Sequence, residues 1–253
     1  MNAVWTLVER ELVRFFRQKN RIAGAIGQPL IFWILFGTAF KASFQPPGSD
    51  ETYSQFFLPG IAVLIVLFTA IFSTISIIED RREGFLQGVL VAPVSRSVIV
   101  LGKILGGSAL AVVQAALFLL LAPLAGLPLG FIDFFAAVAV LFVIAFALCG
   151  LGFCIAWRMD STQGFHAIMS VFLLPLWLLS GAVFPAAGLD AWLALLLKIN
   201  PLSYGVSALR HALDMGEPVP GWGVSLLITA LFALVTFLGA LAMAGRRAAG
   251  DLR

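Results

Sequence analysis

Six long apolar stretches dominate this sequence and restrict what it can fold into. A helix needs about 20 apolar residues to cross the hydrocarbon core of a bilayer. Charged residues make up 11% of the chain, compared with about 25% in ordinary soluble domains. The sequence therefore predicts an all-α membrane protein with six transmembrane helices. The predicted spans are residues 22–40, 56–78, 99–124, 131–157, 164–184 and 222–244.

The stretch between the fifth and sixth spans has apolar pieces of its own. Residues 189–199 and 202–213 are too short to cross a bilayer, and apolar segments of this length favour re-entrant or interfacial helices. We predict a single transmembrane domain over residues 1–253. Its parts are an interface helix (1–21), spans one to five (22–184), short re-entrant outer helices (185–221) and span six (222–245).

The N-terminal segment has the pattern of an amphipathic helix. Trp5 and Phe15 fall on its apolar side, and Arg10 and Arg14 fall on the other side. Such a helix lies in the plane of the lipid headgroups. The pattern fits a simple interfacial anchor and a role in binding a partner equally well.

The distribution of positive charge predicts the orientation. If both termini are cytoplasmic, only three of the 16 Lys and Arg residues, Lys41, Lys198 and Arg210, lie in outer segments. The other 13 lie on the inner side, as the positive-inside rule requires. We therefore expect both termini in the cytoplasm.

The sequence has no motif for chemistry of its own. It lacks the phosphate-binding pattern G-x-x-x-x-G-K-[ST] and the metalloprotease pattern H-E-x-x-H. Cys149 and Cys154 lie in one apolar run and indicate neither a disulfide framework nor a metal site. We expect no catalytic, cofactor-binding or metal-binding residue in this chain. The spans are nearly free of ionisable residues away from their ends, which argues against an ion-driven carrier.

A dense charged turn follows the second span, and a short patch around Pro93 comes after it. The turn consists of Glu79, Asp80, Arg81, Arg82 and Glu83, and the patch runs over residues 90–96 and includes Leu90, Pro93 and Arg96. Residues 200–210 contain a second string, Asn-Pro-Leu-x-Tyr followed by Ala-Leu-Arg. In these features the sequence resembles the membrane subunits of type-2 ATP-binding-cassette (ABC) exporters.

This resemblance implies a function and a set of partners. The charged turn and the patch would contact a separate ATPase subunit, next to the interface helix. ATP and Mg²⁺ would bind to that subunit and not to this chain. Two ATP-binding subunits would join two permease chains, which form a homodimer or include a related chain, in the cytoplasmic (inner) membrane. The cargo would be a hydrophobic drug, a lipid-like molecule or a glycan-linked molecule, and no nucleic acid is involved.

The second and fifth spans contain candidate residues for a translocation path. Polar side chains recur at helical spacing on the second span, with aromatic rings on nearby turns, and the alternative is that they only pack between helices. The candidates are Thr69, Phe72, Ser73, Ser76, Phe172 and Leu176. Gly102 and Gly106 form a G-x-x-x-G pattern, which we expect to serve packing within the subunit.

A different class of function remains open from the sequence alone. A membrane assembly or scaffold protein would also have apolar spans and charged loops that recruit partners. Such a protein would show no coupling to an ATPase and would tolerate polar changes in the second span.

Overall fold

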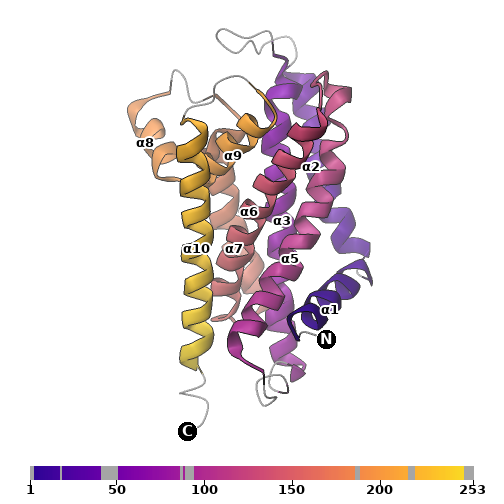
Figure 1. Cartoon of the computed structure of the whole chain (residues 1–253), viewed down its shortest axis with the longest axis vertical. Helices are drawn as coiled ribbons and strands as arrows, with labels where there is room; N and C mark the ends of the chain where they lie inside the picture. Colours follow the sequence, from indigo (N-terminus) through magenta and orange to yellow (C-terminus); the bar gives the residue numbers. More distant parts are fainter. Residues whose placement is uncertain are drawn as a thin grey trace.

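The computed structural model describes residues 3–17, 19–40, 51–85, 88, 94–185, 189–215 and 220–247. All regular elements within these residues are helices, so the predicted all-α class is confirmed. The long helices form a bundle around one axis (Figure 1). The elements are α1 (Ala3–Arg17), α2 (Lys19–Ala39), α3 (Tyr53–Arg82), α5 (Arg96–Leu119), η1 (Ala122–Ala125), α6 (Phe131–Ala156), α7 (Thr162–Trp177), η2 (Leu178–Ala182), α8 (Ala191–Ile199), α9 (Pro201–Ala212) and α10 (Trp222–Arg247).

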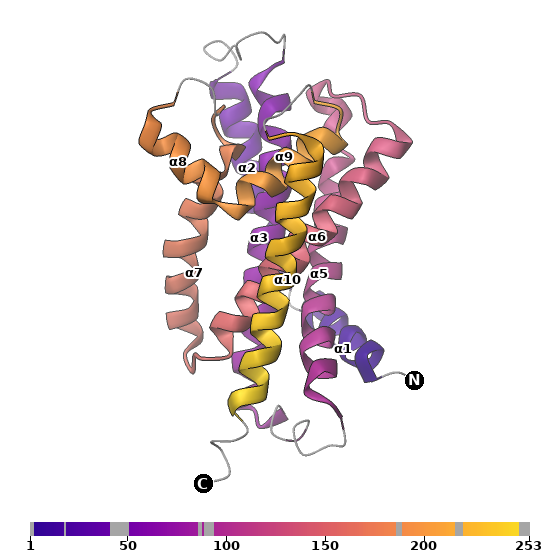
Figure 2. The ribbon, with the colours of Figure 1, turned by 60° about the vertical axis from the view of Figure 1, so that its left-hand side comes forward.

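The bundle has two ends, a basal end and an apical end. The basal end holds the last turns of α3, α6 and α10 and the first turns of α5 and α7, and both chain termini lie toward it in Figures 1 and 2. The apical end holds η1, η2, α8 and α9.

Five helical segments in the described part of the chain are long and apolar enough to cross a membrane. They are α3, α5, α6, α10 and the segment Thr162–Ala182, which joins α7 to η2. These segments correspond to five of the six predicted spans. The remaining predicted span, 22–40, coincides with most of α2, in which the described apolar part is Ala23–Ala39. A crossing by α2 therefore stays a prediction.

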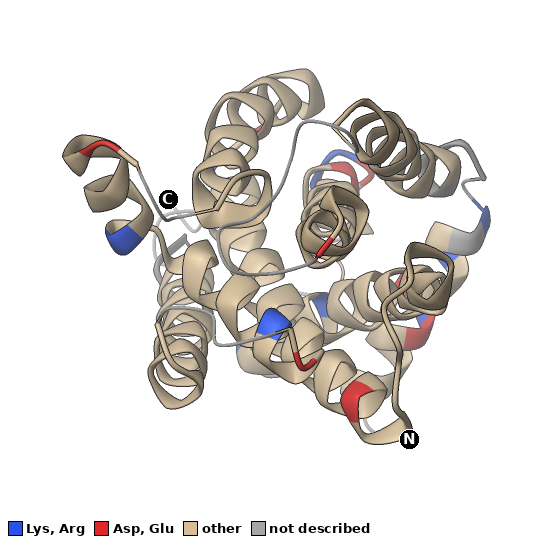
Figure 3. Ribbon diagram, turned by 90° about the horizontal axis from the view of Figure 1, so that it is seen from above, with Lys and Arg blue, Asp and Glu red and all other residues tan. Residues whose placement is uncertain are grey.

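The pair α8 and α9 lies where the sequence predicts short outer helices. The two helices are bent by 81° at their junction, which is the geometry of a broken span or a re-entrant loop. α8 projects from the side of the apical end in Figures 1 and 2. The view down the bundle in Figure 3 shows few charged residues along the long helices.

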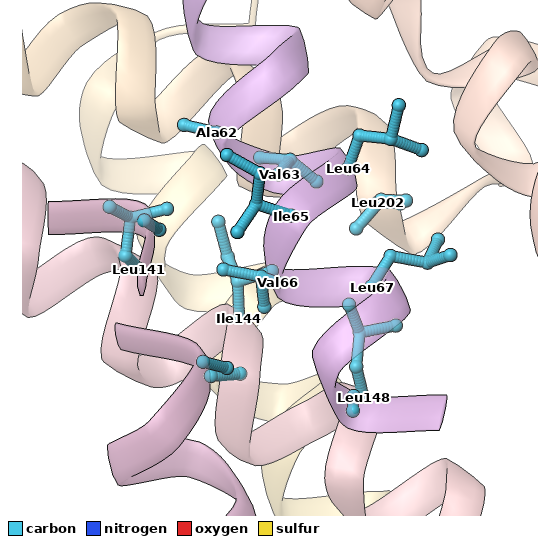
Figure 4. Packing of buried hydrophobic residues seen from close by; sticks show 14 of the residues in the cluster. Ala62, Val63, Leu64, Ile65, Val66, Leu67, Leu141, Ile144, Leu148 and Leu202 are labelled. Carbon is cyan, nitrogen blue, oxygen red and sulfur yellow. The ribbon is translucent and has the colours of Figure 1, made fainter. Parts of the chain in front are cut away.

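α3 is the central helix of the bundle. It contacts α2, α5, α6 and α7, and nearly its whole length is buried. In Figure 4, residues 62–67 point to several sides of α3, where Leu141, Ile144 and Leu148 of α6 and Leu202 of α9 lie. A helix that is surrounded in this way needs apolar side chains all round, and residues 56–67 are such a run.

The Asn-Pro-Leu string supports a break in the neighbouring helix. α7 ends in the irregular segment η2, where Gly181 has a φ of +75°, a conformation that favours glycine. The Asn200 amide donates hydrogen bonds to the carbonyls of Leu176 (2.6 Å) and Leu179 (2.8 Å), and its oxygen caps the first turn of α9. Arg210 donates to the carbonyl of Gly181 at 2.9 Å. α9 thus holds the broken end of α7 in place.

Candidate functional site

The candidate site is built on the face that α1 turns toward the bundle. Val8, Glu11 and Phe15 recur at helical spacing and are all buried, whereas Trp5 is 61% exposed. α1 packs against α5, beside the basal half of the bundle (Figure 1). Of the predicted interface-helix residues, Phe15 therefore faces the protein and Trp5 faces away from it.

Two glycines of α5 make room for this contact. A Cβ atom at Gly102 would lie 2.7 Å from the Cβ of Leu7, and one at Gly106 would lie 2.9 Å from the Cβ of Glu11. Both distances are too short for real side-chain contacts, so only glycine allows α1 to approach this closely. The G-x-x-x-G pattern serves packing within the subunit, as the sequence predicts.

A buried lysine joins α1, α3 and α5 beside these glycines. Lys103 of α5 donates hydrogen bonds to Glu11 Oε1 of α1 (2.6 Å), to Ser76 Oγ of α3 (3.0 Å) and to Asp80 Oδ2 of α3. Ser76 in turn donates to Glu11 Oε2 at 2.9 Å. Lys103 is 7% exposed, Glu11 4% and Asp80 0%. Three helices are thus joined by charged groups that water hardly reaches.

Two arginines of α1 complete this group, which we call the basal cluster: Arg10, Glu11, Arg14, Ser76, Glu79, Asp80 and Lys103. Arg10 binds both carboxylate oxygens of Asp80, at 2.7 and 3.1 Å. Arg14 donates to Asp80 at 2.6 Å and to Glu79 at 2.9 Å. Within this group three cations face three carboxylates, and the exposed Glu83 lies a further 3.7 Å from Arg14.

The cluster favours the charged form of Arg10. Burial alone would lower the pKa of Arg10, but the hydrogen bonds to Asp80 and the negative charges of Asp80 and Glu11 outweigh burial. The net effect raises the pKa of Arg10 above its usual value. Paired guanidinium groups with this two-pronged geometry hold carboxylates in a fixed orientation.

The other arginines of the predicted partner contact bind the ends of neighbouring helices. Arg81 donates to the carbonyls of Trp157 (2.7 Å) and Met159 (3.0 Å), just after α6. Arg82 donates to the carbonyl of Asp160 at 2.9 Å. Cations stabilise helix C-termini, where carbonyls lack partners within the helix. These contacts fix the charged turn against the junction of α6 and α7.

Arg96, at the start of α5, makes the same kind of contact with α10. Its guanidinium donates to the carbonyls of Ala244 (3.2 Å) and Gly245 (2.8 Å). The predicted contact residues are therefore spread over several helix ends at the basal side. Leu90 and Pro93 lie outside the described residues.

Two sets of residues that the sequence predicts separately come together here. Glu79 and Asp80 of the charged turn pair with Arg10 and Arg14 of the interface helix. Asp80 is enclosed within the protein, whereas Arg82 and Glu83 are exposed. The exposed pair can reach a partner at this surface directly.

The predicted path residues lie on two helices, α3 and α7. Thr69 donates to Gln114 of α5 at 2.9 Å, and Phe72 stacks on Phe68. Phe172 of α7 is exposed and Leu176 is half-buried. Phe72, Ser73 and Ser76 line one small pocket beside the basal cluster, and Phe172 and Leu176 lie elsewhere. The pocket is lined by Glu11, Arg14, Phe15, Phe72, Ser73, Ser76 and Leu110.

Glu11 and Lys103 belong to the basal cluster but are not among the site residues predicted from the sequence. Lys103 is predicted at the edge of a span, but α5 begins at Arg96, so Lys103 lies about two turns inside the helix. Lys103 is also the only charged residue between Arg96 and Asp133, and a lone charge in an apolar helix is a signal for function. Glu11 shares the helical face of Val8 and Phe15, which predicts its burial.

Comparison with known proteins gives a family match over most of the chain. A family model described as ABC-2 type transporter matches residues 2–213, which include α1 to α9. A protein from Cyanophora paradoxa that is named a transport permease, ycf38, is 29% identical over 254 residues, covering 93% of this chain and 86% of the relative.

Two further relatives carry more specific names. The daunorubicin resistance ABC transporter permease protein DrrB1 of Streptomyces coeruleorubidus is 24% identical over 245 residues, covering 96% of this chain and 85% of the relative. Nodulation protein J of Sinorhizobium fredii (strain NBRC 101917 / NGR234) is 28% identical over 235 residues, covering 89% and 86% of the two chains.

Proposed function

Because this chain belongs to the ABC-2 type transporter family, we propose that it is the membrane-spanning subunit of an ATP-driven exporter. The match confirms the resemblance predicted from the sequence, and the family is one of membrane transport permease subunits. The five long apolar helices agree with that role. ATP is hydrolysed by a separate ATP-binding subunit, and this chain supplies the route across the membrane.

One observation carries the proposed contact with the ATPase subunit. At the basal end, α1 and the charged turn, which forms the end of α3, are joined into a single packed unit by Arg10, Arg14 and Asp80. Arg82 and Glu83 lie on the exposed side of this unit. A rigid surface with exposed charges is suited to move as one body when a bound partner changes shape. We assign the docking role to Glu83 and Arg82, although Arg82 also donates from Nε to the carbonyl of Asp160. Asp80, Arg81 and Arg96 have the internal bracing role.

The proposed orientation places the basal end in the cytoplasm. The start of α1 and the end of α10 lie toward this end, and the predicted topology assigns 13 of the 16 Lys and Arg residues to the cytoplasmic side. The positive-inside rule supports that orientation. The protein then resides in the cytoplasmic (inner) membrane with both termini cytoplasmic.

The proposed assembly contains two permease chains and two ATP-binding subunits. The permeases form a homodimer or pair with a related chain, and the cargo passes between them. ATP and Mg²⁺ bind to the ATPase subunits, and this chain binds neither cofactor nor nucleic acid. Its remaining apolar surface contacts membrane lipid.

The proposed cargo is a hydrophobic drug, a lipid-like molecule or a glycan-linked molecule. The printed name of one relative refers to daunorubicin resistance, which supports the first class. The stacked rings of Phe68 and Phe72 beside the hydroxyl of Ser73 on α3 support a lipid-like or amphiphilic cargo. The candidate path consists of Thr69, Phe72, Ser73, Ser76, Phe172 and Leu176.

Co-purification with an ABC ATPase subunit tests this proposal. We expect the wild-type chain in lipid to retain the ATPase and the variant Arg82→Ala/Glu83→Ala to lose most of it. The control is Lys198→Ala, which removes an exposed charge at the apical end. The control should bind as the wild type does. Failure of the wild type to bind any ABC ATPase would favour the scaffold function instead.

A further inference from the structure

Lys103 lies at the point where α1, α3 and α5 meet, and it does not reach the exposed docking surface. We propose that Lys103 is a positioning residue: it holds α1 and the end of α3 as one unit, and this unit must stay intact for the permease to respond to ATP turnover. The inference rests on the proposed function, because it assigns to Lys103 the bracing of the surface that docks the ATPase.

The ammonium group of Lys103 has a hydrogen-bond acceptor for each of its N–H donors. An ammonium group has three N–H donors, and Lys103 has three acceptors, one from each of Glu11, Ser76 and Asp80. Glu11 comes from α1, and Ser76 and Asp80 lie one turn apart on α3. The lysine therefore fixes the distance and rotation between the two helices.

The surface of α5 around Lys103 also allows α1 to approach closely. Gly102 precedes the lysine and Gly106 follows it by three residues, and these glycines face Leu7 and Glu11 of α1. The same stretch of α5 thus supplies a close contact and a buried cation to α1. A helix that only anchors to lipid headgroups needs neither.

The cluster extends from Lys103 to the segment that follows α3. Asp80 binds Lys103 on one side and Arg10 on the other. The Arg10 guanidinium lies 3.7 Å above the ring of Phe85, just beyond the charged turn. A continuous series of contacts therefore leads from the interior of α5, through Asp80 and Arg10, to the segment that follows α3.

Stability alone does not require a charged group at this position. Replacing a buried ion pair by apolar residues of similar volume is often neutral or stabilising. Removing only one partner is costly, because it leaves a buried charge without compensation. A bracing role is therefore tested best by a charge-balanced change that spares the fold.

The experiment compares Lys103→Met with the charge-balanced pair Glu11→Gln/Lys103→Met, in complex with the ATPase subunit in lipid. In the balanced pair, Asp80 keeps Arg10 and Arg14, so no buried carboxylate is left alone. The control is Ser108→Ala, which removes a buried hydroxyl of α5 that donates to the carbonyl of Ile104 in its own helix and is not part of the basal cluster.

Two quantities are measured on each variant. The first is permease-dependent ATP turnover, defined as the turnover of the complex divided by that of the free ATPase subunit. The second is the distance between spin labels at Thr6→Cys and Val113→Cys, both exposed, in a background with Cys149→Ala and Cys154→Ala. The labelled parent must keep the wild-type turnover ratio.

We expect the wild type and Ser108→Ala to give one narrow label distance, with and without ATP and vanadate. The balanced pair should still fold and still bind the ATPase, but its label distance should broaden. Its turnover ratio should fall at least about fivefold, the lower end of the usual coupling between sites.

A narrow distance and a turnover ratio within about twofold of the wild type, well inside that coupling range, would overturn the inference. The two proposals fail in different ways. If no ATPase binds the wild-type chain, the proposed function fails. If the ATPase binds but the balanced pair behaves as the wild type, only the role of Lys103 fails.

Discussion

Asp80 is fully enclosed at the basal end and accepts hydrogen bonds from Arg10, Arg14 and Lys103. Its two carboxylate oxygens therefore serve three cations from two helices. A carboxylate in this position neutralises the positive charges that would otherwise repel each other. Asp80 therefore has a structural role, even though the sequence predicts it in a charged turn after a span.

Asp80→Ala should strongly destabilise the permease. The change leaves Lys103 and two arginines without their shared counter-charge, and breaking a buried pair from one side costs about 3–5 kcal/mol. Thermal or denaturant unfolding in detergent measures the loss.

Asp160→Ala is the matched control for this change. Asp160 also pairs with an arginine, Arg81, but its side chain is 79% exposed. An exposed pair contributes at most about 1 kcal/mol. Equal losses from Asp80→Ala and Asp160→Ala would show that the basal cluster is no more than a surface ion pair.

At the scale of whole helices, α1 is held by shape as much as by charge. Gly102 and Gly106 let it approach α5, and Val8 and Phe15 fill the contact. The amphipathic pattern predicts a helix at this place, and the structure has one. Its position in the headgroup plane stays a prediction, whereas its packing on α5 is a property of the fold.

Gly106→Val should push α1 away from α5. The added Cβ would meet the Cβ of Glu11 at 2.9 Å, and the branched side chain would intrude further. Hydrogen exchange of the α1 amides, followed by mass spectrometry in nanodiscs, should become faster while exchange in α6 is unchanged. Gly24→Val in α2 is the control, because nothing lies within 4 Å of its added Cβ. Unchanged protection of α1 in Gly106→Val would show that the glycine does not seat this helix.

The brace between α9 and the broken end of α7 gives a second prediction at this scale. Asn200→Asp keeps the oxygen that caps α9 but loses the amide that donates to Leu176 and Leu179. It also sets a carboxylate against two carbonyls. We expect a loss of about 1–3 kcal/mol in unfolding free energy, the cost of leaving buried acceptors unpaired. Wild-type stability in Asn200→Asp would mean that only the helix cap matters.

At the scale of the whole molecule, the sequence predicts the class and most of the long helices well. Long apolar runs reveal α3, α5, α6 and α10 because burial in lipid or protein demands apolar side chains. The first span is less clear from its residues, since the apolar run of α2 is interrupted by Gln28 and Pro29. The break after α7 is also not visible from composition, because it depends on the backbone at Leu179 and Gly181.

The site is predicted less completely than the fold. The charged turn and the interface helix are both found from sequence, but their pairing through Arg10, Arg14 and Asp80 is a tertiary contact between residues about 70 positions apart. No local pattern encodes such a contact. The roles of Arg81 and Arg96 likewise depend on which helix ends lie beside them.

We propose that the basal end of this permease docks an ABC ATPase subunit through the exposed side of the charged turn. The decisive experiment is site-specific photo-crosslinking from position 83 in membranes that contain both proteins. We expect a crosslinked product with the ATP-binding subunit from Glu83 and none from Lys198 at the apical end. No product from position 83, or equal yields from both positions, would contradict it.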